Sequence, residues 1–265
     1  MIGFIGGGNM AEALIKGARG EWHGAQEEML VSEPNNERRE YLEHVYGVRT
    51  TPSNAEVASS CSIIILAVKP QHMEAVLNEI AAGINDTKTV VSIAAGITLS
   101  YLQSKLKTDK IIRVMPNTPA LIQEGMSVMS LCECFSGAEI NSVRTILMSV
   151  GRVMTLPERL MDAVTAMSGS GPAFIALFLE AMIDAGEKMG LSRDDATQLA
   201  VQTAVGTAKL LDAGMSPEKL RQMVTSPGGT TAAGLKVFED KGLRPMVADS
   251  LLAAKNRAEE LGKKA

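Results

Sequence analysis

The chain has 265 residues, of which 46% are hydrophobic and 21% charged, and its formal net charge is −4. This length suits one large domain or two of moderate size, with the composition of an ordinary soluble globular enzyme. The small negative charge provides no basic surface for nucleic acid or for an anionic membrane, so neither is predicted as a partner.

Short β-rich runs alternate with amphipathic helical stretches up to about residue 157. Strands are predicted over 2–5, 29–32, 62–68, 89–93, 110–115, 126–131 and 152–156. Helices are predicted over 9–19, 35–46, 71–82, 98–107 and 138–148. The uninterrupted apolar run at 62–68 is typical of a central parallel strand that is buried on both faces. The alternation predicts an α/β Rossmann fold with a doubly wound, mostly parallel sheet.

The strand pattern stops after about residue 157, which places a domain boundary between 157 and 158. Five helices are predicted beyond it, over 172–189, 192–213, 216–224, 230–241 and 243–262. The first of these is apolar almost all the way round at its start, so it must be buried on most sides. An oligomer interface is the natural place for such a helix in a small domain.

The N-terminal segment and the apolar runs predict neither export nor membrane insertion. Met1 leads directly into a strand, with no basic region or cleavage signal of a secretory peptide. The longest apolar stretch, 172–179, is interrupted by Glu180 and is too short to cross a bilayer.

The chain has three cysteines, an odd number that favours a reducing compartment and a cytoplasmic protein. Cys61 opens an apolar run and is expected to be a buried thiol. Cys132 and Cys134 could form half of a metal or redox site, but there is no second pair and no histidine near them in sequence. No bound metal is predicted.

The segment after the first strand fits the pattern G-x-G-x-x-A, from Gly6 to Ala11. Because it follows a strand and opens a helix, it has the context of a dinucleotide-binding loop. Gly6 allows the tight turn, Gly8 lets a pyrophosphate approach the backbone, and Ala11 lets the helix pack close to the sheet. The alternative is a glycine turn that binds nothing.

The end of the second strand decides between NAD and NADP in such folds. Glu33 could accept a hydrogen bond from a ribose 2′-hydroxyl, which favours NAD, and its charge would repel a 2′-phosphate. If Glu33 points away, nearby polar side chains could hold that phosphate, namely Ser32, Asn35, Asn36, Arg38 and Arg39. Glu33 could also be a solvated surface acid, so both cofactors stay open.

Three further segments follow predicted strands, where ligands bind in open α/β sheets. Lys69 follows the buried apolar strand and is placed to face cofactor or substrate, unless it is a surface lysine. Small residues at 94–96 and the run 116–119 end the next two strands. They leave room for a nicotinamide ring, or they are plain turns.

Two glycine-containing segments interrupt the helical half. Ser226-Pro227-Gly228-Gly229-Thr230-Thr231 ends one helix and can start another, whose N–H groups attract anions. It is therefore a candidate pocket for a small carboxylate or phosphate. The segment 168–172 opens the long apolar helix and either adds N–H groups to that site or is only a helix entry.

GFIGGGNMA, LAVKP, SIAAG, RVMPNTPA, MSGSGPAF and SPGGTTAAGL, in this order and spacing, closely resemble the pyrroline-5-carboxylate reductase family. The resemblance covers essentially the whole chain, and its last two segments are the most specific. It implies a Rossmann domain at 1–157 and an all-helical domain at 158–265 for dimerisation and substrate binding. It implies homodimers that can assemble into rings, with a site between one subunit's cofactor domain and the partner's helical domain.

The resemblance also implies the reaction, in which NADPH or NADH reduces the ring C=N bond of 1-pyrroline-5-carboxylate to L-proline, the last step of proline biosynthesis. The residues that it assigns to the cofactor are Ile5, Gly6, Gly7, Gly8, Asn9, Met10, Ser32, Glu33, Asn54, Ala67, Val68, Lys69, Pro70, Ala94 and Ala95. Those for the cyclic imino acid are Ser226, Gly229, Thr230 and Thr231, with Lys69 a further candidate. The acid at Glu33 departs from the family pattern and puts the NADP preference in question.

The chemistry needs no strong protein acid, because a cyclic imine is basic enough to be partly protonated near neutral pH. No histidine lies in a strand-end motif with a carboxylate partner. Thr231 is predicted to contact the imine nitrogen through its hydroxyl, while the N–H groups of Gly229 and Thr230 hold the carboxylate. Catalysis then rests mainly on the orientation of the nicotinamide against the imine carbon.

Two other functions fit the sequence less well. β-Hydroxyacid dehydrogenases share the two-domain plan but need a lysine one turn into the helix after the glycine motif, and 174–179 contains none. A dinucleotide sensor without turnover is the other alternative, although every motif expected around the substrate is present.

Overall fold

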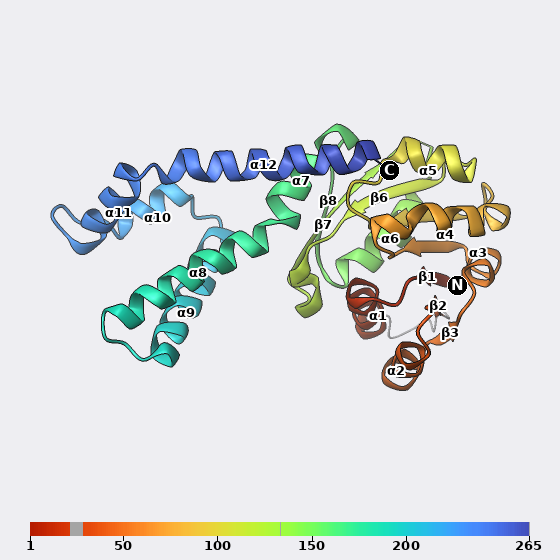
Figure 1. Ribbon diagram of the computed structural model, residues 1–265, viewed down its shortest axis with the longest axis horizontal. Helices are drawn as coiled ribbons and strands as arrows, with labels where there is room; N and C mark the ends of the chain where they lie inside the picture. Colours follow the sequence, from red (N-terminus) through yellow and green to blue (C-terminus); the bar gives the residue numbers. More distant parts are fainter. Residues whose placement is uncertain (22–28, 133, 265) are drawn as a thin grey trace. The chain divides into compact units, whose positions relative to one another are not determined.

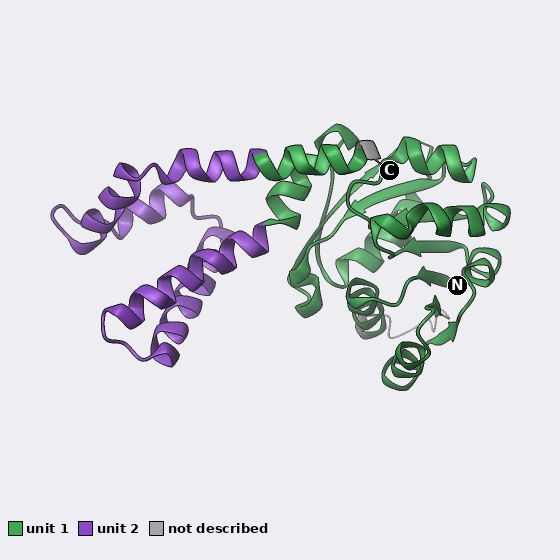
Figure 2. Ribbon diagram, viewed as in Figure 1, with its two compact units in different colours: residues 1–170, 253–265 green, residues 171–252 purple. Residues whose placement is uncertain are grey.

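The structure, a computed structural model, describes residues 1–21, 29–132 and 134–264. It divides into two compact units, shown in separate colours in Figure 2. Unit 1 comprises residues 1–170 and 253–265, and unit 2 comprises residues 171–252. The predicted domain boundary between 157 and 158 stays a prediction.

Unit 1 contains an eight-stranded sheet with the order β3-β2-β1-β4-β5-β6-β7-β8 (Figure 1). The strands are β1 (Ile2–Ile5), β2 (Met29–Ser32), β3 (Arg49–Thr51), β4 (Ile63–Leu66), β5 (Thr89–Ser92), β6 (Ile111–Met115), β7 (Gly125–Leu131) and β8 (Gly151–Thr155). All neighbouring pairs are parallel except β6 with β7. The strand order reverses between β1 and β4, and ligands bind at the carboxyl ends of strands at such a point. The prediction of a doubly wound, mostly parallel sheet is confirmed.

Helices bury both faces of this sheet. One apolar cluster joins the strands to α1 (Asn9–Glu21), α2 (Asn36–Tyr46) and α6 (Gly137–Met148). The other cluster includes α3 (Asn54–Ser60), α4 (Met73–Ile80) and α5 (Leu99–Leu106). Phe4 belongs to the first cluster and Ile5 to the second, because successive strand side chains point to opposite faces.

The short elements of unit 1 are the ones that the sequence analysis misses. Strand β3 has three residues, and α3 has seven, too few for a visible periodicity. The turns after β8 are η4 (Glu158–Leu160), α7 (Met161–Val164) and the π-helical turn η5 (Thr165–Gly169). Buried Arg113 of β6 holds them through ion pairs with Glu158 (3.1 Å) and Asp162 (3.5 Å). Short 3₁₀ turns lie at η1 (Pro70–His72), η2 (Ala81–Gly83) and η3 (Thr118–Ile122).

Unit 2 is helical, as predicted. Its helices are α8 (Gly171–Lys188), α9 (Arg193–Asp212), α10 (Pro217–Met223), α11 (Thr230–Asp240) and the first part of α12 (Leu243–Lys264). Ser192 and Ser216 cap α9 and α10 by accepting hydrogen bonds from Asp195 N and Lys219 N. These caps are the N-terminal signals that the sequence displays.

The apolar start of α8 is exposed in the single chain, so the burial that its composition requires is not met there. Ile175 is 61% exposed and Leu177 is 65% exposed. By length and composition alone, the helical run Glu158–Lys188 could cross a membrane, and only 6% of its most apolar window is buried. The prediction from the sequence considered only the apolar stretch 172–179, which ends at Glu180. The continuous helical run is longer than that stretch.

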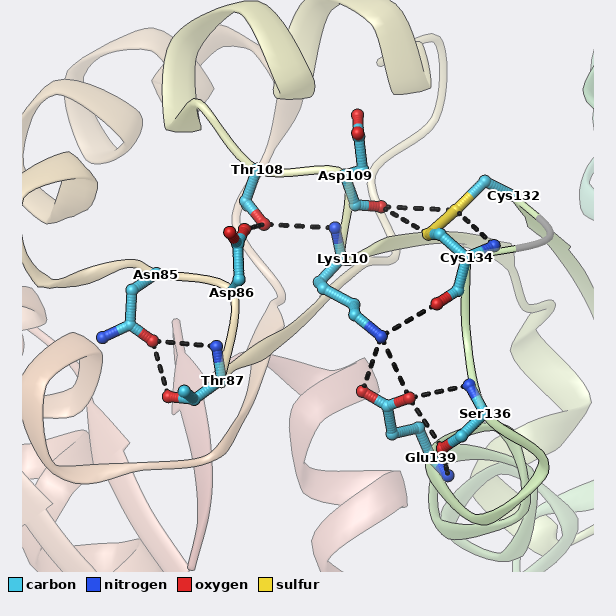
Figure 3. A network of polar contacts seen from close by, with 10 residues as sticks. All are labelled: Asn85, Asp86, Thr87, Thr108, Asp109, Lys110, Cys132, Cys134, Ser136 and Glu139. Carbon is cyan, nitrogen blue, oxygen red and sulfur yellow. Dashed lines mark hydrogen bonds and ion pairs between the residues drawn. A yellow bond between two sulfur atoms is a disulfide. The ribbon is translucent and has the colours of Figure 1, made fainter.

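A polar network ties the loop after β7 to the turn before β6 (Figure 3). Cys132 and Cys134 form a disulfide, with both sulfurs within 3.5 Å of the Asp109 carbonyl oxygen. Lys110 Nζ donates to the Cys134 carbonyl (2.9 Å) and to the Glu139 carboxylate (3.0 Å). The antiparallel pairing of β6 with β7 brings these segments together.

The cysteines differ from the sequence expectation of a reduced protein. The odd cysteine count gives no sign of the Cys132–Cys134 disulfide, whereas Cys61 is a free, buried thiol as expected. Within residues 1–21, 29–132 and 134–264, no group of three or more His, Cys, Asp or Glu side chains could hold a metal ion.

Glu139 is expected to make the stability of unit 1 sensitive to acid. Hydrogen bonds from Ser136, then from Lys110, lower the pKa of Glu139 from 4.5 to about 2. A carboxylate with a depressed pKa in the folded state stabilises the fold above the unfolded pKa, and this contribution is lost as the pH falls toward the folded pKa. The contribution of Glu139 to the free energy of unfolding is therefore lost between pH 4.5 and about pH 2.

Denaturant titrations at a series of pH values test this expectation. Glu139→Gln should lose less of its free energy of unfolding than the parent between about pH 5 and about pH 3. Glu124→Gln, a change at an exposed glutamate, is the control and should follow the parent. Parallel pH profiles for the parent and Glu139→Gln would contradict the expectation.

Candidate active site

The glycine-rich turn lies at the carboxyl ends of β1 and β4. Gly6 has a φ of 96°, and a Cβ there would lie 2.8 Å from the Ala67 carbonyl oxygen, so glycine is required. Gly6 N donates to Ser32 O (2.9 Å), and Ala67 N donates to Ile5 O (2.8 Å). These bonds bring the ends of β1, β2 and β4 into one edge.

The same turn has room for a pyrophosphate. Gly8 is exposed, and a Cβ placed on it would meet nothing within 4 Å. Helix α1 begins at the next residue, Asn9, so the first N–H groups of its opening turn have no intrahelical acceptor. The donor set and the open space fit the phosphates of a dinucleotide.

Ser32 and Glu33 are predicted to lie at the adenosine ribose, and Asn54 is predicted to contact the rest of the dinucleotide. Glu33 Oε2 accepts a hydrogen bond from Gly7 N (2.9 Å). Ser32 Oγ donates to Asn54 Oδ1 (2.6 Å), and Asn54 Nδ2 donates to Glu79 Oε2 (2.7 Å). Glu33 and the Ser32 carbonyl therefore contact the glycine loop directly, and Asn54 is joined to it through Ser32.

The remaining predicted cofactor residues follow the next strands. Ala67 and Val68 are half-buried, whereas Lys69 and Pro70 are exposed at the start of η1. Ile93 N donates to Leu66 O (3.2 Å), so buried Ala94 and half-buried Ala95 follow β5 on the same edge of the sheet. The sequence gives no sign that Gly96 packs against Leu261 near the end of α12, where a Cβ on Gly96 would lie 3.4 Å from the Leu261 Cβ.

Asn117 joins two motifs that the sequence presents separately. Its Nδ2 donates to Ser168 Oγ (3.2 Å) and Ser168 O (3.3 Å), and its Oδ1 accepts from Met126 N (2.8 Å). Asn117 follows β6, and Ser168 lies in the π-helical turn η5. This amide therefore joins the sheet edge to η5, and π-helical turns of this kind occur frequently at functional sites.

The predicted substrate residues gather at the start of α11, in unit 2. Gly228 has a φ of 71°, and Gly229 is the N-cap of α11 and donates through its N–H to Ser226 O (3.0 Å). Thr230 and Thr231 form the first turn, where backbone N–H groups have no intrahelical acceptor. Thr231 is half-buried, and no described residue hydrogen-bonds its hydroxyl. Lys69, the other substrate candidate, belongs to unit 1.

Comparison with known proteins identifies the family. A family model described as pyrroline-5-carboxylate reductase dimerisation matches residues 158–261, and one described as NADP oxidoreductase, coenzyme F420-dependent, matches residues 1–96. A pyrroline-5-carboxylate reductase of a Synechocystis species is 44% identical over 264 residues, which cover 99% of this chain and 98% of the relative. The chain belongs to the pyrroline-5-carboxylate reductase family.

Solved structures of pyrroline-5-carboxylate reductases agree in fold and extent. That of Coxiella burnetii has a TM-score of 0.90 at 35% identity and covers 98% of this chain and 97% of its own. The Plasmodium falciparum enzyme, crystallised with NADP bound, has a TM-score of 0.88 at 32% identity with the same coverage. These matches confirm the resemblance drawn from the six sequence motifs and the Rossmann fold with a helical domain.

Proposed function

We propose that this chain catalyses the NAD(P)H-dependent reduction of L-1-pyrroline-5-carboxylate to L-proline, the last step of proline biosynthesis. The observation that carries the proposal is the 44% identity to a named reductase over 99% of the chain. Two helix N-termini support the proposal, since such ends attract anions: one is the start of α1 and the other is the start of α11. The bond that is reduced is the cyclic C=N bond.

The cofactor is proposed to bind along the carboxyl edge of β1, β2, β4 and β5. The open space at Gly8 and the N–H groups that open α1 receive the pyrophosphate. When bound, the reduced nicotinamide supplies the hydride. The proposed contacts are Ile5, Gly6, Gly7, Gly8, Asn9, Met10, Ser32, Glu33, Asn54, Ala67, Val68, Lys69, Pro70, Ala94 and Ala95.

The substrate is proposed to bind at the first turn of α11. The N–H group of Thr230 holds the carboxylate with the support of Ser226, because a helix N-terminus favours negative charge. The Gly229 N–H, predicted to share this role, donates to Ser226 O (3.0 Å) within the turn, so it has to leave that acceptor before it can bind the carboxylate. The Thr231 hydroxyl, which has no partner among the described residues, hydrogen-bonds the ring nitrogen. Lys69, which follows β4 in unit 1, is the further candidate for binding the substrate. These groups orient the imine against the nicotinamide. The ring nitrogen of the protonated imine already holds the proton that the amine needs, so the hydride step takes none from a protein acid.

A homodimer is part of the proposal, with dimers able to assemble into rings. The family model that matches 158–261 is described as a dimerisation region, and exposed apolar side chains such as Ile175, Leu177 and Phe178 lie on α8. A second copy would cover them and account for the apolar composition of this helix without a membrane. Light scattering on the purified protein tests this, and a monomer at micromolar concentration would contradict it.

A cytoplasmic location completes the proposal, since reduced nicotinamide dinucleotides are produced in that compartment. The Cys132–Cys134 disulfide does not favour this location, because cytosolic disulfides are uncommon. Cell fractionation decides the location directly.

A direct spectrophotometric assay tests the reaction. The purified protein is mixed with racemic pyrroline-5-carboxylate and either NADH or NADPH, and the absorbance of the reduced nicotinamide is followed. We expect oxidation of the nucleotide with equimolar formation of proline. Binding of the nucleotide without oxidation of either form would support a sensor and overturn the reductase.

A further inference from the structure

The carboxylate of Glu33 is fixed at the point where β2 ends. Its Oε2 accepts from Gly7 N (2.9 Å), and its Oε1 accepts from Asn35 N (3.0 Å). Gly7 is buried, and a Cβ placed on it would lie 3.3 Å from the Glu33 Cβ, so the side chain packs directly on the glycine loop. The negative charge therefore has a defined position beside the loop.

The two arginines next to Glu33 are engaged with other groups. Arg38 Nε donates to Gly7 O (2.7 Å), and its NH2 group pairs with the Glu12 carboxylate. Arg39 NH1 donates to the carbonyls of Glu33 (2.7 Å) and Pro34 (3.0 Å). An arginine binds a phosphate by presenting two N–H groups as a fork. Here Nε and NH2 of Arg38, and NH1 and NH2 of Arg39, already donate to oxygen atoms of the protein.

Glu12 reinforces this arrangement from α1. Tyr41 and Tyr46 donate their hydroxyls to Glu12 Oε1 at 2.9 and 2.7 Å. Burial acts to raise the pKa of Glu12, but the hydrogen bonds from Tyr46, Arg38 and Tyr41 lower it overall, so the carboxylate stays ionised beside Arg38. The positive charge of Arg38 is thus balanced by Glu12, and its Nε–H group is hydrogen-bonded to the Gly7 carbonyl.

We infer that this chain prefers NADH to NADPH, and that Glu33 is the residue that determines this preference. Acidic side chains at the end of the second strand accept the ribose 2′-hydroxyl of NAD, whereas a 2′-phosphate there would face a fixed like charge. The Plasmodium falciparum relative has NADP bound, so the comparison with relatives does not itself predict NADH. The inference depends on the position of Glu33 in this chain. The inference rests on the proposed function, which includes binding of a nicotinamide dinucleotide. Nucleotide binding can be measured without the imine substrate, so the preference is tested separately from the reaction.

Isothermal titration calorimetry measures the preference directly. The full-length protein is titrated with NADH and, separately, with NADPH, in the absence of the imine substrate. We expect the Kd for NADH to be lower than that for NADPH by about tenfold or more. Equal affinities, tighter binding of NADPH, or no binding of either nucleotide would overturn the inference.

Glu33→Gln then assigns the preference to one side chain. Glutamine keeps the side-chain length and an oxygen for Gly7 N, but it removes the charge. We expect it to tighten NADPH binding several-fold and to narrow the ratio of the two Kd values. Glu37→Gln removes an equal charge from an exposed position in the first turn of α2 and should leave the ratio unchanged. A ratio that moves equally in both variants, or in neither, contradicts the assignment to Glu33.

The reaction gives a second readout with a separable outcome. The ratio of kcat/KM for NADH to that for NADPH should follow the ratio of affinities. Preferential NADH binding without reduction of pyrroline-5-carboxylate would leave this inference standing while the proposed function fails. Reduction of pyrroline-5-carboxylate with a higher kcat/KM for NADPH would support the proposed function and overturn this inference.

Discussion

Thr231→Ala is expected to lower kcat by roughly ten- to a thousandfold. The Thr231 hydroxyl has no partner among the described residues, so it is available to the ring nitrogen of the substrate. That bond strengthens while the nitrogen changes from an imine to an amine, and its loss therefore acts on the transition state more than on binding. Steady-state kinetics with both substrates varied separates the two effects.

The fold should tolerate this change. Thr231 is half-buried in the first turn of α11, and alanine favours a helix more than threonine does. Circular dichroism and thermal melting of Thr231→Ala should match the parent. Thr231→Ser, which keeps the hydroxyl, should recover most of kcat. Parental turnover in Thr231→Ala would remove this residue from the mechanism.

Arg113→Met is expected to reduce the free energy of unfolding by about 3 kcal/mol. The Arg113 side chain is only 5% exposed and contacts both Glu158 and Asp162. Glu158 Oε1 also accepts from Leu99 N (2.7 Å), so one carboxylate connects β6, α5 and the turns after β8. Without the guanidinium group, two like charges face an apolar side chain, and the segment 158–164 loses its ion pairs with β6.

Urea titration measures this loss. Lys236→Ala is the matched control, because it removes one partner of an ion pair between exposed side chains and should leave the unfolding midpoint unchanged. Adding Glu158→Gln and Asp162→Asn to Arg113→Met should recover part of the stability by removing the stranded charges. Equal midpoints for Arg113→Met and the parent would show that these ion pairs do not stabilise the fold.

Local signals in the sequence were sufficient for the long elements and for the cofactor turn. The apolar run of β4, the serine caps of α9 and α10 and the glycine spacing of the loop each depend on neighbouring residues only. Short β3 and α3 carry too few residues for a periodicity, although Ser53 with Glu56 three residues later is a cap signal that could have located α3.

Long-range contacts were beyond the sequence, because tertiary packing decides them. The orientation of Glu33 toward Gly7 joins residues 26 positions apart, and Asn117 meets Ser168 across 51 positions. The sequence placed an acid at the end of β2 but left its direction open. Nor could it pair Cys132 with Cys134, since a spacing of one residue is equally compatible with two free thiols.

If the proposed homodimer covers the exposed apolar side chains of α8, dilution of the protein should destabilise its fold as a denaturant does. In a lone chain, water would contact Ile175 and Leu177, whose exposed fractions are 61% and 65%. The folded state then gains free energy from association, so the melting temperature should depend on protein concentration. The amount of chain in the cell, and not only its sequence, would set how much of the enzyme is folded.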